Sequence, residues 1–317
     1  MSSPVLIKYN INEIFSCMED NILLSEELKK YCSHTFNKNR SILEDLKQSM
    51  TQITESYFHG NNPNDIAFKN IIRENLNKIN NKNYNNILTV LKTLNYSNEN
   101  HFMLLVHELI LKSMNDVLAS KGIDNKDTKT PSEIYMSIAN EFGGLCIINS
   151  DTNANIYFKN ILTKECRQYF KTFTDKNTSM DRNNPHRVSN YKGFMNMIGI
   201  LYTLEIFPNE IIQKCFSKIS KLILNSGLSQ DECDNYYNGY ERLLNRILHH
   251  FDNNVSIENA EEFKIVKSYI DTFNNKILSA CGNNVDKNDK PLRMYSLIVH
   301  KQNIKRLNSI SEKYTQL

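Results

Sequence analysis

Glycine and proline are so scarce in this chain that it has to be built mainly from long helices. Only 9 Gly and 6 Pro occur among 317 residues, although both residues are normally needed for the many turns of β-rich and α/β folds. Neither a GxGxxG turn nor a GxxxxGK[ST] phosphate loop is present. The sequence therefore predicts an all-α fold and argues against protein kinases, P-loop proteins and Rossmann-type enzymes.

Apolar residues recur at helical spacing from residue 64 onward. This spacing predicts helices over 66–79, 84–94, 102–118, 131–142, 156–173, 190–204, 209–224, 230–251, 259–279 and 290–307. The segment 102–118 is apolar around most of its circumference, which is typical of a helix buried between neighbours. Successive pairs have close to the roughly 40–47 residues of a HEAT repeat, so we expect a HEAT-repeat-like crescent of about five antiparallel pairs.

The chain is predicted to contain three parts. Residues 1–60 are expected to form a partly ordered helical arm, because their apolar residues are too thinly spread for a deep core. The sequence His59-Gly-Asn-Asn-Pro63 marks the boundary. Residues 61–310 are predicted to form the helical domain, and residues 311–317 a C-terminal tail.

Cysteine usage and hydropathy predict a cytoplasmic protein. The 7 cysteines are scattered without a CxxC pair, which is typical of a reducing compartment. The sequence shows no signal peptide and no apolar run of about 18 residues. The surplus of Asn, Lys and Ile is typical of an AT-rich genome.

Histidines and acidic residues do not form a recognisable catalytic or metal site. His107-Glu108 begins like the zinc-protease motif HExxH, but position 111 is Leu. The neighbouring His249 and His250 would point about 100° apart on a helix. A Cys/His nucleophile pair stays open, since sequence alone does not exclude it. We therefore expect a protein that is not an enzyme and needs no metal or cofactor.

Basic residues are concentrated between positions 159 and 192. They are Lys159, Lys164, Arg167, Lys171, Lys176, Arg182, Arg187 and Lys192. Few acidic residues oppose them, so the span predicts a ridge on which RNA phosphates bind by counterion release. A solvated helix face without a ligand is the alternative. The aromatic residues between these cations have helical spacing, which predicts that most of them belong to the core.

Three segments resemble the middle domain of eukaryotic translation initiation factor 4G. In Ile71–Tyr84, an apolar helix ends in Leu76-Asn-Lys-Ile79 and a polar turn precedes Tyr84, as at the opening of that domain. The segments 157–170 and 191–206 resemble its third-repeat helix and its Gly-containing helix. The resemblance covers about residues 64–310 in the family's order. It departs at the polar loop before residue 131 and at the C-terminal helix pair.

The resemblance implies a grip on a DEAD-box RNA helicase of the factor 4A type. The family's domain is a HEAT crescent that holds the two helicase lobes and accelerates ATP turnover without catalytic residues of its own. The residues that match its first contact are Leu76, Ile79 and Tyr84, and Arg293 and Met294 match the second more loosely. The alternative is that Leu76, Ile79 and Tyr84 are core residues that pack between the first two helices.

The arm carries a motif that resembles the docking site for the cap-binding protein, factor 4E. In Lys8-Tyr-Asn-Ile-Asn-Glu-Ile-Phe15, Tyr9 is followed after four residues by Ile14 and Phe15. These three residues lie within about two helical turns, so a loose segment could fold as a helix in a partner's groove. The alternative is that Tyr9 belongs to a stray N-terminal helix.

Together these features predict a non-catalytic translation-initiation scaffold, monomeric when free. It would bridge the factor 4E-type and factor 4A-type proteins and recruit mRNA weakly or nonspecifically. One alternative is a related middle-domain scaffold in mRNA processing or decay, which has no need of the Tyr9 motif. Another is a helical-repeat RNA-binding adaptor that uses the basic ridge. Compared with full-length 4G scaffolds the chain is minimal, which suggests a protist or a large DNA virus as its source.

Overall fold

The computed structural model describes residues 63–115, 129–148, 154–175, 180, 185–224, 227–282, 292 and 294–317. The chain divides into two units at the bond between Asn62 and Pro63, and all described residues belong to the second unit. The predicted site residues that lie outside the described residues are Tyr9, Ile14, Phe15, Lys176, Arg182 and Arg293.

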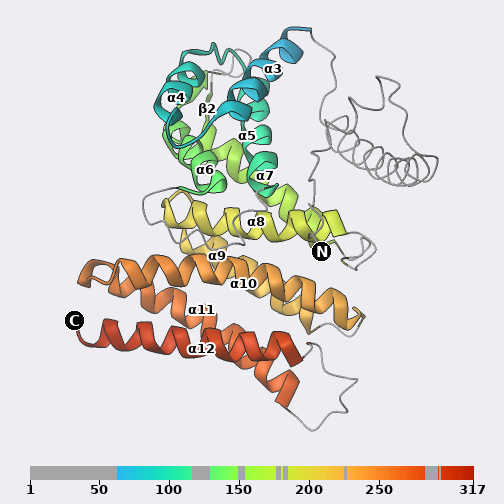
Figure 1. The fold of residues 1–317 in the computed structure, drawn as a ribbon, viewed down its shortest axis with the longest axis vertical. Helices are drawn as coiled ribbons and strands as arrows, with labels where there is room; N and C mark the ends of the chain where they lie inside the picture. Colours follow the sequence, from blue (N-terminus) through green and yellow to red (C-terminus); the bar gives the residue numbers. More distant parts are fainter. Residues whose placement is uncertain are drawn as a thin grey trace, which may run out of the picture. The chain divides into compact units, whose positions relative to one another are not determined.

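The described part of the chain is helical apart from one small hairpin (Figure 1), which confirms the all-α fold class. Its ten helices are α3 (Pro63–Lys78), α4 (Tyr84–Thr93), α5 (Glu99–Met114), α6 (Pro131–Phe142), α7 (Phe158–Phe173), α8 (Pro185–Thr203), α9 (Asn209–Ile223), α10 (Gln230–Asn253), α11 (Ile257–Gly282) and α12 (Met294–Thr315). The strands β1 (Cys146–Ile148) and β2 (Asn155–Tyr157) pair in antiparallel fashion.

The hairpin corrects the predicted start of one helix. A helix was expected over 156–173, but β2 takes the first positions of that range and α7 begins at Phe158. Ile147 of β1 lies opposite Ile156 of β2, and β-branched residues favour such extended pairing. The Phe158 N–H donates a hydrogen bond to the Leu145 carbonyl (3.0 Å). The hairpin therefore fixes the point at which α7 begins.

The helices pack in two rows. In the odd-numbered row, α3 packs on α5, α5 on α7, and α9 on α11. In the even-numbered row, each helix from α4 to α10 packs on the next even-numbered helix, and Figure 1 shows α8, α10 and α12 side by side. Two rows of stacked helices are typical of a helical repeat protein, which the rhythm of the predicted helices indicated. The crescent stays a prediction.

Helix α7 contacts α8 through aromatic side chains and leaves a space beside α9. Tyr169 and Phe173 contact Phe194 and Tyr191 of α8, with ring centroids 6.2 Å and 5.7 Å apart. Between α7 and α9 lies a pocket, which Ile198 of α8 also lines. The odd-numbered row is therefore less tightly packed at this point.

Two helix starts are encoded by reciprocal caps. The Thr130 hydroxyl accepts a hydrogen bond from the Glu133 N–H (3.3 Å), and the Glu133 carboxylate accepts one from the Thr130 N–H (2.7 Å). Ser229 and Glu232 repeat this arrangement at the start of α10. Such a capping box satisfies backbone donors that the helix leaves unpaired. The predicted starts of α6 and α10 are confirmed.

Helices α8 and α12 extend furthest beyond their predicted limits. Helix α8 begins at Pro185 rather than at residue 190, and α12 ends at Thr315 rather than at residue 307. Near the end of α12, Ile310 is buried and Tyr314 stacks on Phe263 of α11 with ring centroids 4.4 Å apart. These contacts keep the last turns helical, so most of the predicted tail 311–317 belongs to α12.

Candidate functional site

The turn between α3 and α4 is held by asparagine side chains. The Asn83 side chain accepts a hydrogen bond from the Asn80 N–H (2.7 Å) and donates one to the Lys78 carbonyl (2.8 Å). The Asn80 side chain accepts from the Lys82 N–H (2.9 Å) and from the Asn83 N–H (3.2 Å). Asparagine commonly satisfies backbone groups in turns in this way. The predicted polar turn is therefore a defined loop that fixes both helix ends.

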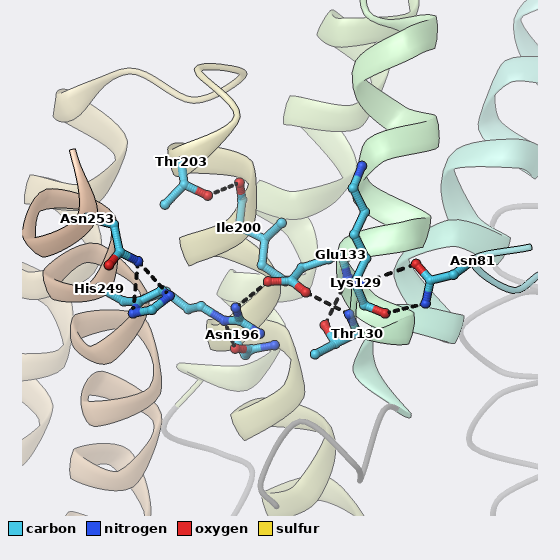
Figure 2. Close-up of polar contacts among 10 residues, drawn as sticks. Asn81, Lys129, Thr130, Glu133, Asn196, Ile200, Thr203, His249 and Asn253 are labelled. Carbon is cyan, nitrogen blue, oxygen red and sulfur yellow. Dashed lines mark hydrogen bonds and ion pairs between the residues drawn. The ribbon is translucent and has the colours of Figure 1, made fainter. Parts of the chain in front are cut away.

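A second set of contacts joins this turn to the start of α6. The Asn81 side chain donates to the Lys129 carbonyl (2.9 Å) and accepts from the Lys129 N–H (3.2 Å), as Figure 2 shows. The Lys129 ammonium lies 5.4 Å from the centre of the Tyr84 ring, within cation–π distance. Burial and then the Glu141 carboxylate raise the pKa of Tyr84 to about 12. The phenol therefore stays protonated at neutral pH.

The three residues predicted for the first helicase contact differ in exposure. Leu76 is fully buried, and its carbonyl accepts a hydrogen bond from the Tyr135 hydroxyl (3.4 Å). Ile79 and Tyr84 are half-buried. The structure thus corrects the role of Leu76, because a side chain without solvent-exposed surface belongs to the core and cannot touch a partner. Ile79 and Tyr84 remain accessible on the two sides of the turn.

The second predicted helicase contact lies where α12 begins. Met294 is the first residue of this helix, and the preceding Leu292 is buried. The Met294 side chain and the whole of Arg293 fall outside the described part of the chain. The structure therefore places the helix start, and the contact itself stays a prediction.

A polar network crosses three even-numbered helices. From α10, Arg246 donates to the Asn196 side chain of α8 (2.8 Å) and to the Glu133 carboxylate of α6 (2.6 Å). Figure 2 labels these two acceptor residues. Burial acts to raise the pKa of Glu133, but Arg246 and hydrogen bonds from Thr130 outweigh it and hold this pKa below its ordinary value. The carboxylate that caps α6 therefore also ties this helix to the next two of its row.

The His107–Glu108 pair is occupied by structural contacts. Arg73 of α3 donates to both oxygens of Glu108, at 2.6 Å and 3.2 Å. The Tyr169 hydroxyl of α7 lies 2.9 Å from Nδ1 of His107. In the part of the chain that the structure describes, no group of three or more His, Cys, Asp or Glu is arranged to hold a metal ion. The pair therefore couples α5 to α3 and α7.

The predicted basic ridge is only partly one surface. Its α7 members are exposed, and they are Lys159, Lys164, Arg167 and Lys171. Of these, Lys164 lies 3.8 Å from the carboxylate of Glu99 on α5. The pair is largely solvent-exposed, so it contributes little stability. Helix α7 therefore presents a positively charged face, as predicted.

The α8 members of the ridge serve other contacts. Arg187 donates to the Thr172 carbonyl (2.6 Å) and lies 5.7 Å from the centre of the Phe173 ring. Burial lowers the pKa of Arg187. Lys192 is half-buried, and burial and then Arg242 of α10 lower its pKa. The ridge is corrected to its α7 part among the described residues, because partly buried cations are poorly placed to reach RNA phosphates.

Sequence analysis missed a second basic face on α9. Lys214, Lys218 and Lys221 are exposed, and their spacing of i, i+4 and i+7 places them on one side of the helix. This spacing is visible in the sequence. The position of this basic face, across a pocket from α7, is not visible in the sequence, because it depends on how helices far apart in the sequence pack together.

The pocket between α7 and α9 has a volume of about 250 Å³. Its apolar lining comes from three helices and the turn before α9, and it includes Cys166 and Phe170 of α7, Ile198 of α8, Phe207 of the turn, and Ile211 and Cys215 of α9. Arg167 and Lys214 line the same pocket. The site thus combines an apolar interior with one cation from each of two helices.

None of the described helices is long and apolar enough to cross a membrane. The sequence matches no known family profile, and no curated protein is significantly similar to it.

Proposed function

We propose that this protein is a non-catalytic translation-initiation scaffold that binds a DEAD-box RNA helicase of the factor 4A type and a cap-binding protein of the factor 4E type. The observation that carries the proposal is the fixed α3–α4 turn, which exposes parts of Ile79 and Tyr84. These residues stand where the sequence resembles the helicase contact of the factor 4G middle domain. The two-row helical repeat supplies a rigid frame for such a contact.

A scaffold of this kind accelerates ATP turnover without contributing a catalytic residue. The two helicase lobes have to come together in every cycle, and a protein that holds both near the closed arrangement raises the population of that state. The hydrogen bonds of Asn80, Asn81 and Asn83 hold the contact surface in place before the helicase binds. Such preorganisation reduces the entropy lost on association.

The exposed cations of α7 support an additional contact with mRNA. Contacts of lysine and arginine with phosphates carry no sequence information, so this binding is nonspecific and weakens with salt. A cytoplasmic location and a monomeric free state belong to the same proposal. A helical RNA-binding adaptor is the second candidate, which the added cations of α9 favour. It would bind RNA with steep salt dependence and ignore the helicase.

Replacing Ile79 with aspartate is expected to weaken helicase binding by at least about tenfold, with helix content and melting temperature nearly unchanged. The new carboxylate would lie at the partly exposed turn, where water still solvates it. Leu76→Asp is the matched control. Because Leu76 is fully buried, this variant should lose its fold, since burying an unpaired carboxylate costs several kcal/mol. Calorimetric titration and circular dichroism separate the two effects, and unfolding of both variants would contradict the contact role of Ile79.

Replacing Tyr9 with alanine is expected to weaken capture of the cap-binding protein at least about thirtyfold, because truncating a tyrosine anchor typically costs about 2 kcal/mol or more. The measurement is co-elution of the chain with factor 4E-type and factor 4A-type proteins from cap-analogue resin. Retention of all three is expected for the wild type. Helicase binding without cap retention would favour the related scaffold of mRNA processing or decay, and loss of both would refute the proposed function.

A further inference from the structure

We propose that the pocket between α7 and α9 is a docking site for a short acidic segment of a partner protein, which inserts one large apolar side chain between the two helices. This site lies on other helices than the α3–α4 turn. The α7 cations beside the pocket are those that the proposed function also offers to mRNA, so an acidic segment bound here would compete with RNA. The inference does not depend on the proposed helicase or cap-binding contacts.

The pocket has the size and lining for a single apolar side chain. Its volume is about 250 Å³, whereas an engineered apolar cavity of about 150 Å³ already holds benzene. Burial raises the pKa of Cys215 to about 12 and also raises that of Cys166, so both thiols stay neutral. The Thr163 hydroxyl is engaged with the Lys159 carbonyl (2.7 Å). A phenyl or isobutyl group therefore fits this interior better than a polar one.

The surface around the pocket is positively charged on both sides. Its six cations without an ion pair among the described residues are Lys159, Arg167 and Lys171 of α7 and Lys214, Lys218 and Lys221 of α9. The acidic side chain exposed on the same stripe of α9 is Glu210, one turn before Lys214. The surface therefore complements a negatively charged partner.

The spread of these cations favours a chain with several charges over a ligand with one. Lys159 and Lys171 are separated by twelve residues, which is about 18 Å along a helix. A single carboxylate would reach only the cations nearest the pocket, whereas an extended acidic segment can contact the cations of both α7 and α9.

RNA is the competing polyanion on this surface. A nucleobase in a binding pocket needs hydrogen-bond partners for its edges. Apart from Arg167 and Lys214, which offer donors but no acceptor, the lining is apolar and its hydroxyl is already engaged. A buried apolar anchor surrounded by charged contacts at the rim is instead the usual arrangement of a protein hot spot. The observations therefore favour an acidic peptide.

Fluorescence anisotropy with a panel of labelled peptides tests the proposal on the full chain. Each peptide carries acidic residues on both sides of one central residue, which is Phe, Leu, Trp or Ala. The acidic residues are spaced either to lie on one face of a helix or to alternate along an extended segment. At least one large-anchor peptide should bind at least about tenfold more tightly than its Ala counterpart. A uridine oligonucleotide of similar charge is the comparison ligand.

Three variants locate the binding site. Thr163→Phe should weaken binding of the anchored peptide at least about tenfold by filling the pocket, and Lys214→Glu with Lys218→Glu should do so by reversing the charge of the rim. Lys301→Glu with Lys305→Glu is the matched control, because these exposed lysines have the same i, i+4 spacing on α12 and should leave the affinity unchanged. Unchanged melting temperatures establish that all variants fold.

Two results would overturn the proposal. One is equal binding of the anchored and Ala peptides throughout the panel, which would show that the pocket is not used. The other is tighter binding of the oligonucleotide with no effect of Thr163→Phe, which would make this surface a general polyanion or RNA site.

Discussion

Replacing Gly193 with alanine is expected to lower the free energy of unfolding by about 3 kcal/mol, because α8 approaches the end of α5 too closely for a side chain. A β-carbon at Gly193 would lie 2.1 Å from the carbonyl oxygen of Met114 and 2.8 Å from its carbonyl carbon. These are backbone atoms, so no rotation of a side chain relieves the clash and the helices have to separate. The higher helix propensity of alanine offsets only about 1 kcal/mol.

Gly144→Ala is the matched control for this prediction. A β-carbon at Gly144 would meet no atom within 4 Å, so its free energy of unfolding should stay within about 0.5 kcal/mol of the wild type. Both variants change glycine to alanine and so affect the unfolded chain alike. Urea denaturation measures both. Equal stability of the two variants would contradict the close approach of α5 and α8.

The individual helices could be predicted because their signals are local. Thr130 and Glu133, which lie within four residues of each other, mark the start of α6 by their capping box. The scarcity of Gly and Pro excludes most other folds. The way the helices pair could not be predicted from such signals. Arg246 and Glu133 bond across 113 positions, and nothing near either residue identifies the other. The β1–β2 hairpin was missed because short apolar runs suit a strand and a helix equally well.

The candidate sites show the same limit. Leu76 and Ile79 are both apolar and close in sequence, and periodicity alone does not say that the first is buried while the second is partly exposed. The lysines of α9 have a spacing that predicts a basic face. Their relation to Arg167 appears only when α7 and α9 are placed on opposite sides of one pocket. Sequence patterns therefore predict the composition of these faces, and tertiary packing decides their accessibility.

Lowering the pH from 8 to 5 is expected to reduce the free energy of unfolding by on the order of 4 kcal/mol through the half-buried His107 and the fully buried His300. Burial lowers the pKa of His107 to about 4, although Glu108 acts in the opposite direction, and burial likewise lowers the pKa of His300 to about 4. At pH values between about 4 and the ordinary histidine pKa of 6.5, these two histidines bind protons in the unfolded chain but not in the folded chain. Stability is therefore complete above about pH 6.5 and is lost as the pH falls toward 4.

The variants His107→Gln and His300→Gln test this origin, since each should reduce the difference in stability between pH 8 and pH 5 by on the order of 2 kcal/mol. Each variant is compared with itself at the two pH values in urea denaturation, so any constant cost of the substitution cancels. The two histidines lie on α5 and α12, and effects at distant sites usually add. The double variant should therefore lose these two contributions and keep the smaller one of His250, whose pKa burial also lowers. Burial raises the pKa of Glu165 and of Glu241, so these carboxyls favour the folded state as the pH falls. A wild-type loss that persists in the double variant would show that other groups cause the acid sensitivity.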